Sequence, residues 1–145
     1  VKRNWEKLKM KEGKESVLEG VPRSLPSMVK AQRIQEKARG AGFDWEKPEQ
    51  VWEKVEEEFN EFQEAVSRKD QKEMSAELGD VFFALINYAR FHNLNPDEAL
   101  ERTNRKFISR FRYMEEKVKE SGKTLHELSL AQMDVFWNQA KTTEI

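Results

Sequence analysis

Apolar residues recur along this chain with the period of an α-helix, and strand-like alternation of β-branched residues is absent. After Pro48, large apolar side chains return at alternating intervals of three and four residues. That spacing is typical of a helix packed in a bundle. The stripe comprises Trp52, Val55, Phe59, Phe62 and Val66. We therefore expect an all-α protein.

Helix start and stop signals divide the chain into six predicted helices. Pro48 and Pro96 suit the first turn of a helix, and Ser129 with Gln132 resembles a capping box. Gly40 and Gly122 suit helix ends. The predicted helices cover about 4–11, 27–39, 48–68, 71–92, 95–120 and 129–142. We expect one domain over 1–145, with an N-terminal helix and connector in 1–25 and a helical core in 26–145.

The predicted helix 71–92 is apolar around more than half of its circumference. Its apolar residues include Met74, Leu78, Val81, Phe82, Phe83, Leu85, Ile86, Tyr88 and Phe91. Such a helix is expected to be central and covered on several sides. One chain offers too little cover, and exposed apolar surface of this size marks interfaces. We expect a homodimer or higher homo-oligomer.

Composition excludes several classes of function. The chain has 145 residues and a net charge of −1, so no overall charge attracts it to nucleic acid or to an anionic membrane. It has no cysteine, which rules out disulfides and thiol nucleophiles. No apolar run approaches about 18 residues, so no membrane span is predicted. The start at Val1 is not a secretory signal and lacks an initiator Met. We expect a cytoplasmic location, and the missing initiator Met leaves open that the chain is a fragment of a longer protein.

Two pairs of carboxylates lie at helical spacing. Glu58 and Glu61 are one turn apart, with Glu58 roughly 75° from the centre of the apolar stripe. Glu77 and Asp80 share a face of the most apolar helix, where an unpaired carboxylate costs several kcal/mol. A turn near 69–70 would bring the two pairs face to face. A lysine or arginine could compensate them; converging carboxylates favour a divalent cation such as Mg²⁺, which prefers oxygen ligands.

Two other interpretations, a metal role for Glu56 and a di-iron site that uses the histidines, have less support. Glu56 fits an ordinary solvated helix face. A di-iron bundle would need a glutamate three residues before each histidine, but Ala89 precedes His92 and Lys123 precedes His126. We expect both histidines at the surface or at helix ends.

Longer motifs then resemble a known family. Glu57-Glu58-x-x-Glu61 followed by Glu77-Leu78-Gly79-Asp80 resembles the metal signature of the all-α nucleoside triphosphate pyrophosphohydrolases, and of MazG proteins in particular. The resemblance covers nearly the whole chain. Further MazG-like segments are Ser16–Pro22, Leu25-Pro26, Gly42–Trp45, Asn104-x-Lys106-Phe107, Arg110–Arg112 and Trp137-x-x-x-Lys141. MazG proteins often carry two such domains, and the opening helix resembles the segment before the second. This implies a C-terminal half or a single-domain relative.

The resemblance implies an all-α bundle completed by a second chain and a Mg²⁺-dependent hydrolase, with Mn²⁺ as a substitute. It would cleave (d)NTP to (d)NMP and pyrophosphate by attack of water at the α phosphorus. The metal ligands would be Glu58, Glu61, Glu77 and Asp80. Glu57, the first acid of the signature, would support the ligands or orient the attacking water.

The resemblance also implies substrate-binding residues. Lys106 and Arg110, one turn apart, would grip the phosphates, with Asn104 a weaker candidate. Trp137 would stack on the base beside Lys141, and in a dimer we expect Trp137 or Lys141 to come from the neighbouring chain. Each has an ordinary alternative: a basic surface pair for Lys106 and Arg110, and core packing for Trp137. Phe43 and Trp45 either line the base pocket or anchor their loop.

Two further functions remain open at this point. One is a base-selective, dUTPase-like pyrophosphatase of the same fold, which would share the metal site. The other is a catalytically silent helical interaction module; the presence of all four carboxylates argues against it.

Overall fold

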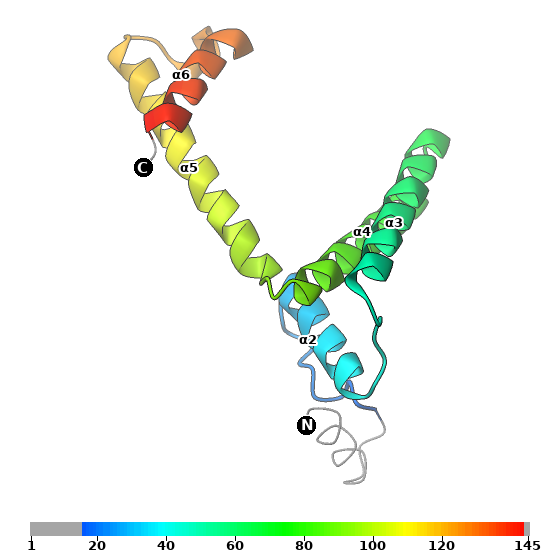
Figure 1. Ribbon diagram of the computed structural model, residues 1–145. Helices are drawn as coiled ribbons and strands as arrows, with labels where there is room; N and C mark the ends of the chain where they lie inside the picture. The colour runs from blue at the N-terminus through cyan, green and yellow to red at the C-terminus, as the bar shows by residue number, and fades with distance from the viewer. Residues whose placement is uncertain (1–15, 144–145) are drawn as a thin grey trace. The chain divides into compact units, whose positions relative to one another are not determined.

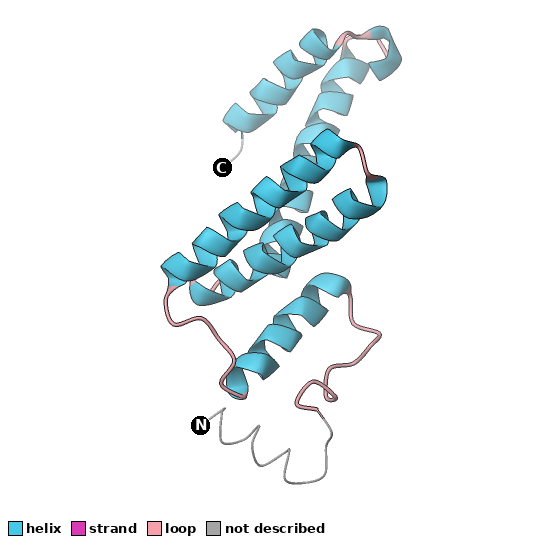
Figure 2. Cartoon of the chain, turned by 90° about the vertical axis from the view of Figure 1, so that its right-hand side faces the viewer, coloured by secondary structure: helices cyan, strands magenta, loops and turns pink. Residues whose placement is uncertain are grey.

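The computed structural model describes residues 16–143, and within this range it contains five α-helices, one short 3₁₀ helix and no strand (Figures 1 and 2). The elements are α2 (Ser27–Gly40), α3 (Pro48–Arg68), α4 (Gln71–Phe91), α5 (Pro96–Glu120), η1 (Leu125–Glu127) and α6 (Leu130–Thr143). The all-α prediction is confirmed, with helix ends within about two residues of those expected. The predicted helix 4–11 lies outside the described residues. No helix in the described range is long and apolar enough to cross a bilayer.

The chain divides into two compact units between Asp97 and Glu98. The first contains α2, α3 and α4, and the second contains most of α5 with η1 and α6. The treatment of 1–145 as one domain stays a prediction.

A tight turn joins α3 to α4, and the two helices form an antiparallel hairpin (Figure 1). Lys69 ends α3 in the left-handed conformation with φ of 57°. The Asp70 carboxylate caps α4 by accepting from the Glu73 N–H at 3.2 Å. Arg68 donates to Glu73 across the turn, from Nε to Oε2 at 3.3 Å. The turn therefore lies at Lys69 and Asp70, as the sequence predicts.

The covered face of α3 is rotated from the predicted stripe. Val51, Val55, Glu58 and Ala65 are buried, and they fall on one side of the helix. Trp52, Phe59 and Val66 are 45%, 42% and 45% exposed. These three lie about 80° around the helix from the buried line. Within one chain, therefore, these three residues do not form the face that packs on α4. The apolar stripe is broader than the strip that α4 covers.

Helix α4 packs against α3 and, less extensively, α2. Val81, Ala84 and Ile86 are buried, while Leu78, Phe82 and Phe83 remain exposed. The expected cover on several sides is thus not complete in the first unit. The loop after α2 is tied to α4, because Arg90 Nη2 donates to Asp44 Oδ1 at 2.7 Å. Gly42 turns that loop with φ of 97°, which favours glycine.

In the second unit, Met114 and Val118 of α5 and Ala140 of α6 are buried. The start of α6 has the expected capping box. The Gln132 N–H donates to Ser129 Oγ at 3.2 Å, and the Ser129 N–H donates to Gln132 Oε1 at 2.9 Å.

Candidate metal centre

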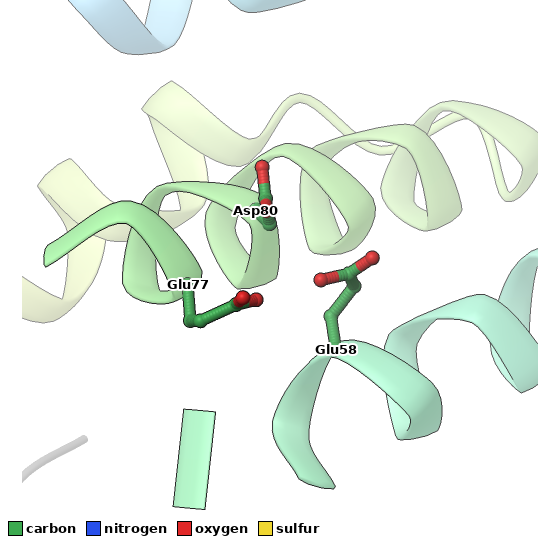
Figure 3. A group of neighbouring side chains, drawn as sticks. All are labelled: Glu58, Glu77 and Asp80. Atoms are coloured by element: carbon green, nitrogen blue, oxygen red, sulfur yellow. The ribbon is translucent and has the colours of Figure 1, made fainter. Parts of the chain in front are cut away.

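Three carboxylates converge on the α3–α4 hairpin. Glu58 of α3 and Glu77 and Asp80 of α4 each offer an oxygen, and these oxygens lie within 4.8 Å of one another. Figure 3 shows Glu58 and Glu77 pointing toward each other from the two helices, with Asp80 one turn beyond Glu77. The turn at Lys69 and Asp70 produces this convergence by setting the register of the two helices.

The burial of these carboxylates is unusual. Glu58 is only 5% exposed, Glu77 is half-buried and Asp80 is exposed. Glu58 Oε2 and Glu77 Oε2 are buried and have no hydrogen-bond partner among the described residues. Such groups carry the full cost of lost hydration. The donor set is all oxygen, which Mg²⁺ prefers. The residues therefore fit a hard divalent cation.

One cation of the chain already touches the cluster. Lys54 Nζ lies 2.8 Å from Glu58 Oε1 and 3.3 Å from Glu57 Oε2. The hydrogen bond to Glu58 raises the pKa of Lys54, so this side chain stays charged. Lys54 compensates one oxygen of Glu58 and leaves the other without a partner. The sequence interpretation missed Lys54, although its i,i+4 spacing to Glu58 was a usable signal.

Glu61 lies beside the cluster, but its oxygens are not part of the three-residue group. Its side chain is half-buried. The charge of Glu58, followed by partial burial and the charge of Glu77, raises the pKa of Glu61 above its usual value of 4.5. Mutual repulsion of this kind is what a shared cation would relieve.

The other acids of the signature helix lie outside the cluster. Glu57 is exposed and is paired with Lys54. Glu56 is exposed, as expected for a solvated position. Both histidines are exposed, His92 at the end of α4 and His126 in η1, which confirms their predicted place.

The predicted substrate-binding residues belong to the second unit. Asn104, Lys106 and Lys141 are exposed, and Arg110 and Trp137 are half-buried. Arg110 lies over the Trp137 ring, 5.9 Å from its centroid. The Phe107 ring is 5.0 Å from the Trp137 ring. Trp137 thus packs on α5, and this contact brings Arg110 and Trp137 together. The role of all five in substrate binding stays a prediction.

The first unit also holds a largely apolar pocket of about 460 Å³. Residues of α2, of the loop after it and of α4 line the pocket. Among them are Ile34, Gln35, Phe43, Trp45, Phe83 and Asn87. Phe43 is 84% exposed, so it does not anchor its loop by burial. The sequence interpretation named Phe43 and Trp45 but missed Gln35 and Asn87, because polar residues on separate helices carry no mark of a shared pocket.

Comparison with known proteins gives consistent matches. Residues 46–114 match the model of the MazG nucleotide pyrophosphohydrolase domain. The chain is 41% identical over 142 residues to the nucleoside triphosphate pyrophosphohydrolase/pyrophosphatase MazG of Thermotoga maritima, covering 96% of this chain and 54% of the relative. It is 36% identical over 147 residues to the nucleoside triphosphate pyrophosphohydrolase of Escherichia coli K12, covering 97% and 56%. It is 47% identical over 145 residues to the uncharacterized protein YabN of Bacillus subtilis, covering 97% and 30%. The chain therefore spans about half the length of the first two relatives.

Proposed function

Because the chain belongs to the MazG nucleotide pyrophosphohydrolase family, we propose that it hydrolyses nucleoside triphosphates to the monophosphate and pyrophosphate, with water attacking the α phosphorus. The observation that carries this proposal is the group Glu58, Glu77 and Asp80, with two buried carboxylate oxygens that have no partner among residues 16–143. A structural role alone does not explain these two buried oxygens, because the ion pair with Lys54 engages only Glu58 Oε1.

The metal proposal is that Glu58, Glu61, Glu77 and Asp80 hold Mg²⁺, with Mn²⁺ as a substitute. The position of Glu61 one turn beyond Glu58 and its raised pKa support its inclusion. When bound, the ion would neutralise phosphate charge and lower the pKa of a coordinated water.

The residues of the chain have their own tasks in this proposal. Helices α3 and α4 hold the acids at fixed spacing, so the site is preorganised. Lys54 fixes the carboxylate of Glu58 by its 2.8 Å contact and leaves Oε2 for a ligand. Glu57, exposed beside the cluster, would orient the attacking water as a hydrogen-bond acceptor. Lys106 and Arg110, with Asn104, would bind phosphate oxygens, and Trp137 with Lys141 would contact the base.

We also propose that the chain works as a homodimer or higher homo-oligomer. The exposed apolar flank of α3 (Trp52, Phe59 and Val66) supports this, as do exposed Leu78 and Phe82 on α4. Apolar surface of this kind gains free energy when another surface covers it.

The position of bond cleavage tests the reaction directly. Hydrolysis in ¹⁸O-water with Mg²⁺ should place the label in the nucleoside monophosphate and none in pyrophosphate. Label in pyrophosphate would mean attack at the β phosphorus, and release of orthophosphate with a diphosphate would mean a different reaction class. The variant Glu56→Gln is the matched control for ligand variants, because Glu56 is exposed on the same helix.

A further inference from the structure

We propose that the apolar pocket of the first unit is a nucleobase site in which Gln35 and Asn87 read the hydrogen-bonding edge of the base. The proposal rests on the proposed function and deepens it. It is an alternative to the base contact proposed above for Trp137, which belongs to the second unit.

Gln35 supplies an acceptor. Its side chain lines the pocket, and the residue is only 5% exposed. Nε2 donates to the Phe83 carbonyl oxygen at 3.0 Å, which fixes the orientation of the amide. Oε1 is left buried with no partner among residues 16–143. A buried amide oxygen without a partner costs free energy, and a ligand with an N–H group would remove that cost.

Asn87 supplies a donor. Its Oδ1 accepts from Arg90 Nη2 at 2.6 Å and from Arg90 Nε at 3.1 Å. With this oxygen engaged, the Asn87 side chain can offer a ligand its Nδ2 amide hydrogens. The pocket thus presents an acceptor and a donor from two helices. The Watson–Crick edge of every nucleobase combines a donor with an acceptor, so this pair suits that edge of a base.

The charge and shape of the pocket favour a base over phosphate. The guanidinium of Arg90 is compensated by Asp44 at 2.7 Å, so the wall carries little free positive charge. Phe43, Trp45 and Phe83 are 84%, 44% and 45% exposed, so flat aromatic surface is available to a ligand. Aromatic surface of this kind binds planar rings by stacking.

The position of the pocket links it to the carboxylates. Asp80 and Asn87 are both on α4, seven residues apart. They are therefore separated by about 10 Å along the helix and by only about 20° around it. Phe83 lies between them and lines the pocket. This separation suits one nucleoside unit, with its phosphate end at the acids and its base between α2 and α4.

Substitution Asn87→Asp tests the proposal with little change in shape. A carboxylate at 87 still accepts from Arg90, but it presents an acceptor where Asn87 presents a donor. The matched control is Asn60→Asp, on the exposed side of α3. Steady-state kinetics with ATP, GTP, CTP and UTP and Mg²⁺ give KM and kcat for each. UTP and GTP carry a carbonyl oxygen where CTP and ATP carry an amino group. In Asn87→Asp, we expect the KM for UTP to rise about tenfold relative to that for CTP, and the KM for GTP to rise about tenfold relative to that for ATP. The kcat values should stay within about twofold of the wild type.

A second variant keeps the test decisive if Asn87→Asp folds poorly. Gln35→Met removes the buried acceptor, and Gln32→Met, one turn earlier and outside this pocket, is its control. We expect Gln35→Met to raise the KM for the nucleotides about tenfold. The inhibition constant of free nucleosides should rise by the same factor. Equal changes for all four nucleotides in Asn87→Asp, with no change of KM in Gln35→Met, would overturn the base site. A wild-type chain inactive on all four nucleotides would instead overturn the proposed function.

Discussion

Two flanks of α3 can be compared: the flank packed on α4 buries a charged residue, and the neighbouring flank exposes aromatic side chains. Each flank indicates a different kind of binding partner. On one flank, Glu58 is 5% exposed although it is charged. On the other, Trp52 and Phe59 are 45% and 42% exposed although they are aromatic. Buried charge needs compensating groups, and Lys54 leaves Glu58 Oε2 without one, whereas exposed apolar surface gains from a second protein surface. The comparison supports the proposed cation at the first flank and the proposed protein partner at the second.

The largest expected effect comes from removing charge on the buried flank. Glu58→Gln and Asp80→Asn should lower kcat/KM by about a hundredfold or more, because the proposed cation loses a ligand. Glu56→Gln should stay within about twofold. The helical circular dichroism signal should be retained in all three. Near-normal turnover in both ligand variants would show that the acidic group has no catalytic role.

Glu58→Gln should also change stability in the opposite direction to activity. Removing a carboxylate from a cluster of acids relieves repulsion, so the metal-free protein should melt at the same temperature or higher. Melting curves with EDTA test this. A melting temperature well below that of the wild type would mean that the Lys54–Glu58 pair outweighs the repulsion.

The exposed flank is tested by placing charge on it. Phe59→Lys should weaken self-association by about tenfold or more, because a desolvated ammonium opposes a covered apolar surface. Asn60→Lys, on the neighbouring exposed position, is the control. Sedimentation velocity over a range of concentrations gives the association constant. A wild-type chain that is monomeric and fully active at micromolar concentration contradicts the proposed assembly.

Shared active sites give a second readout of the same flank. Mixing Glu58→Gln with Lys141→Ala, each inactive alone, should restore part of the activity once subunits exchange. Restoration is expected only if Lys141 acts at a site on the other chain. No recovery after prolonged mixing would place both residues in sites of the same chain.

The sequence predicts the helices well because their signals are local. Pro48 begins α3, Asp70 caps α4 and Ser129 caps α6, and none of these depends on distant residues. The part of the apolar stripe that one chain buries could not be predicted, because it depends on where another helix lies. The stripe through Trp52 and Phe59 has the correct period for a helix but not the orientation that α4 imposes.

The candidate site, like the fold, could be predicted only where its signals are local in the sequence. The pairs at Glu58 with Glu61 and Glu77 with Asp80 have helical spacing, so the sequence could propose them. That Glu58 is in the middle of the covered face, and that Glu77 Oε2 lacks a partner among the described residues, depends on tertiary packing. Gln35 and Asn87 carry no local signal at all, since the donor and acceptor come from helices far apart in sequence.

Removing the internal cation should have a smaller effect than removing a ligand. Lys54→Met leaves Glu58 without its 2.8 Å contact, so the metal-free protein should lose about 1 kcal/mol of unfolding free energy. At saturating Mg²⁺, the difference in unfolding free energy between Lys54→Met and the wild type should be smaller. Urea unfolding with EDTA or with Mg²⁺ measures both values, and Lys119→Met on α5 is the control. An unchanged difference in the two conditions would show that Lys54 does not compensate the metal ligands.

The last expected effect concerns pH and a single carboxylate. Glu58 and Glu77 raise the pKa of Glu61 above 4.5 in the metal-free protein, so Glu61 keeps its proton at a higher pH than a free glutamate. A cation needs the carboxylate form. The affinity for the metal should therefore reach its full value above the raised pKa. It should fall as the pH decreases through that pKa, by at most about tenfold per pH unit from this group.

The stability of the metal-free protein should change with pH in the opposite direction. Its stability falls as the pH rises from 4.5 through the raised pKa, because the folded state must then carry the repelling charge. Mn²⁺ titration calorimetry from pH 4.5 to pH 7.5 in several buffers measures affinity and proton release. Glu61→Gln should weaken binding and abolish the proton release due to this group, while Glu64→Gln should leave both unchanged. Equal proton release in wild type and Glu61→Gln would assign the titration to another carboxylate of the cluster.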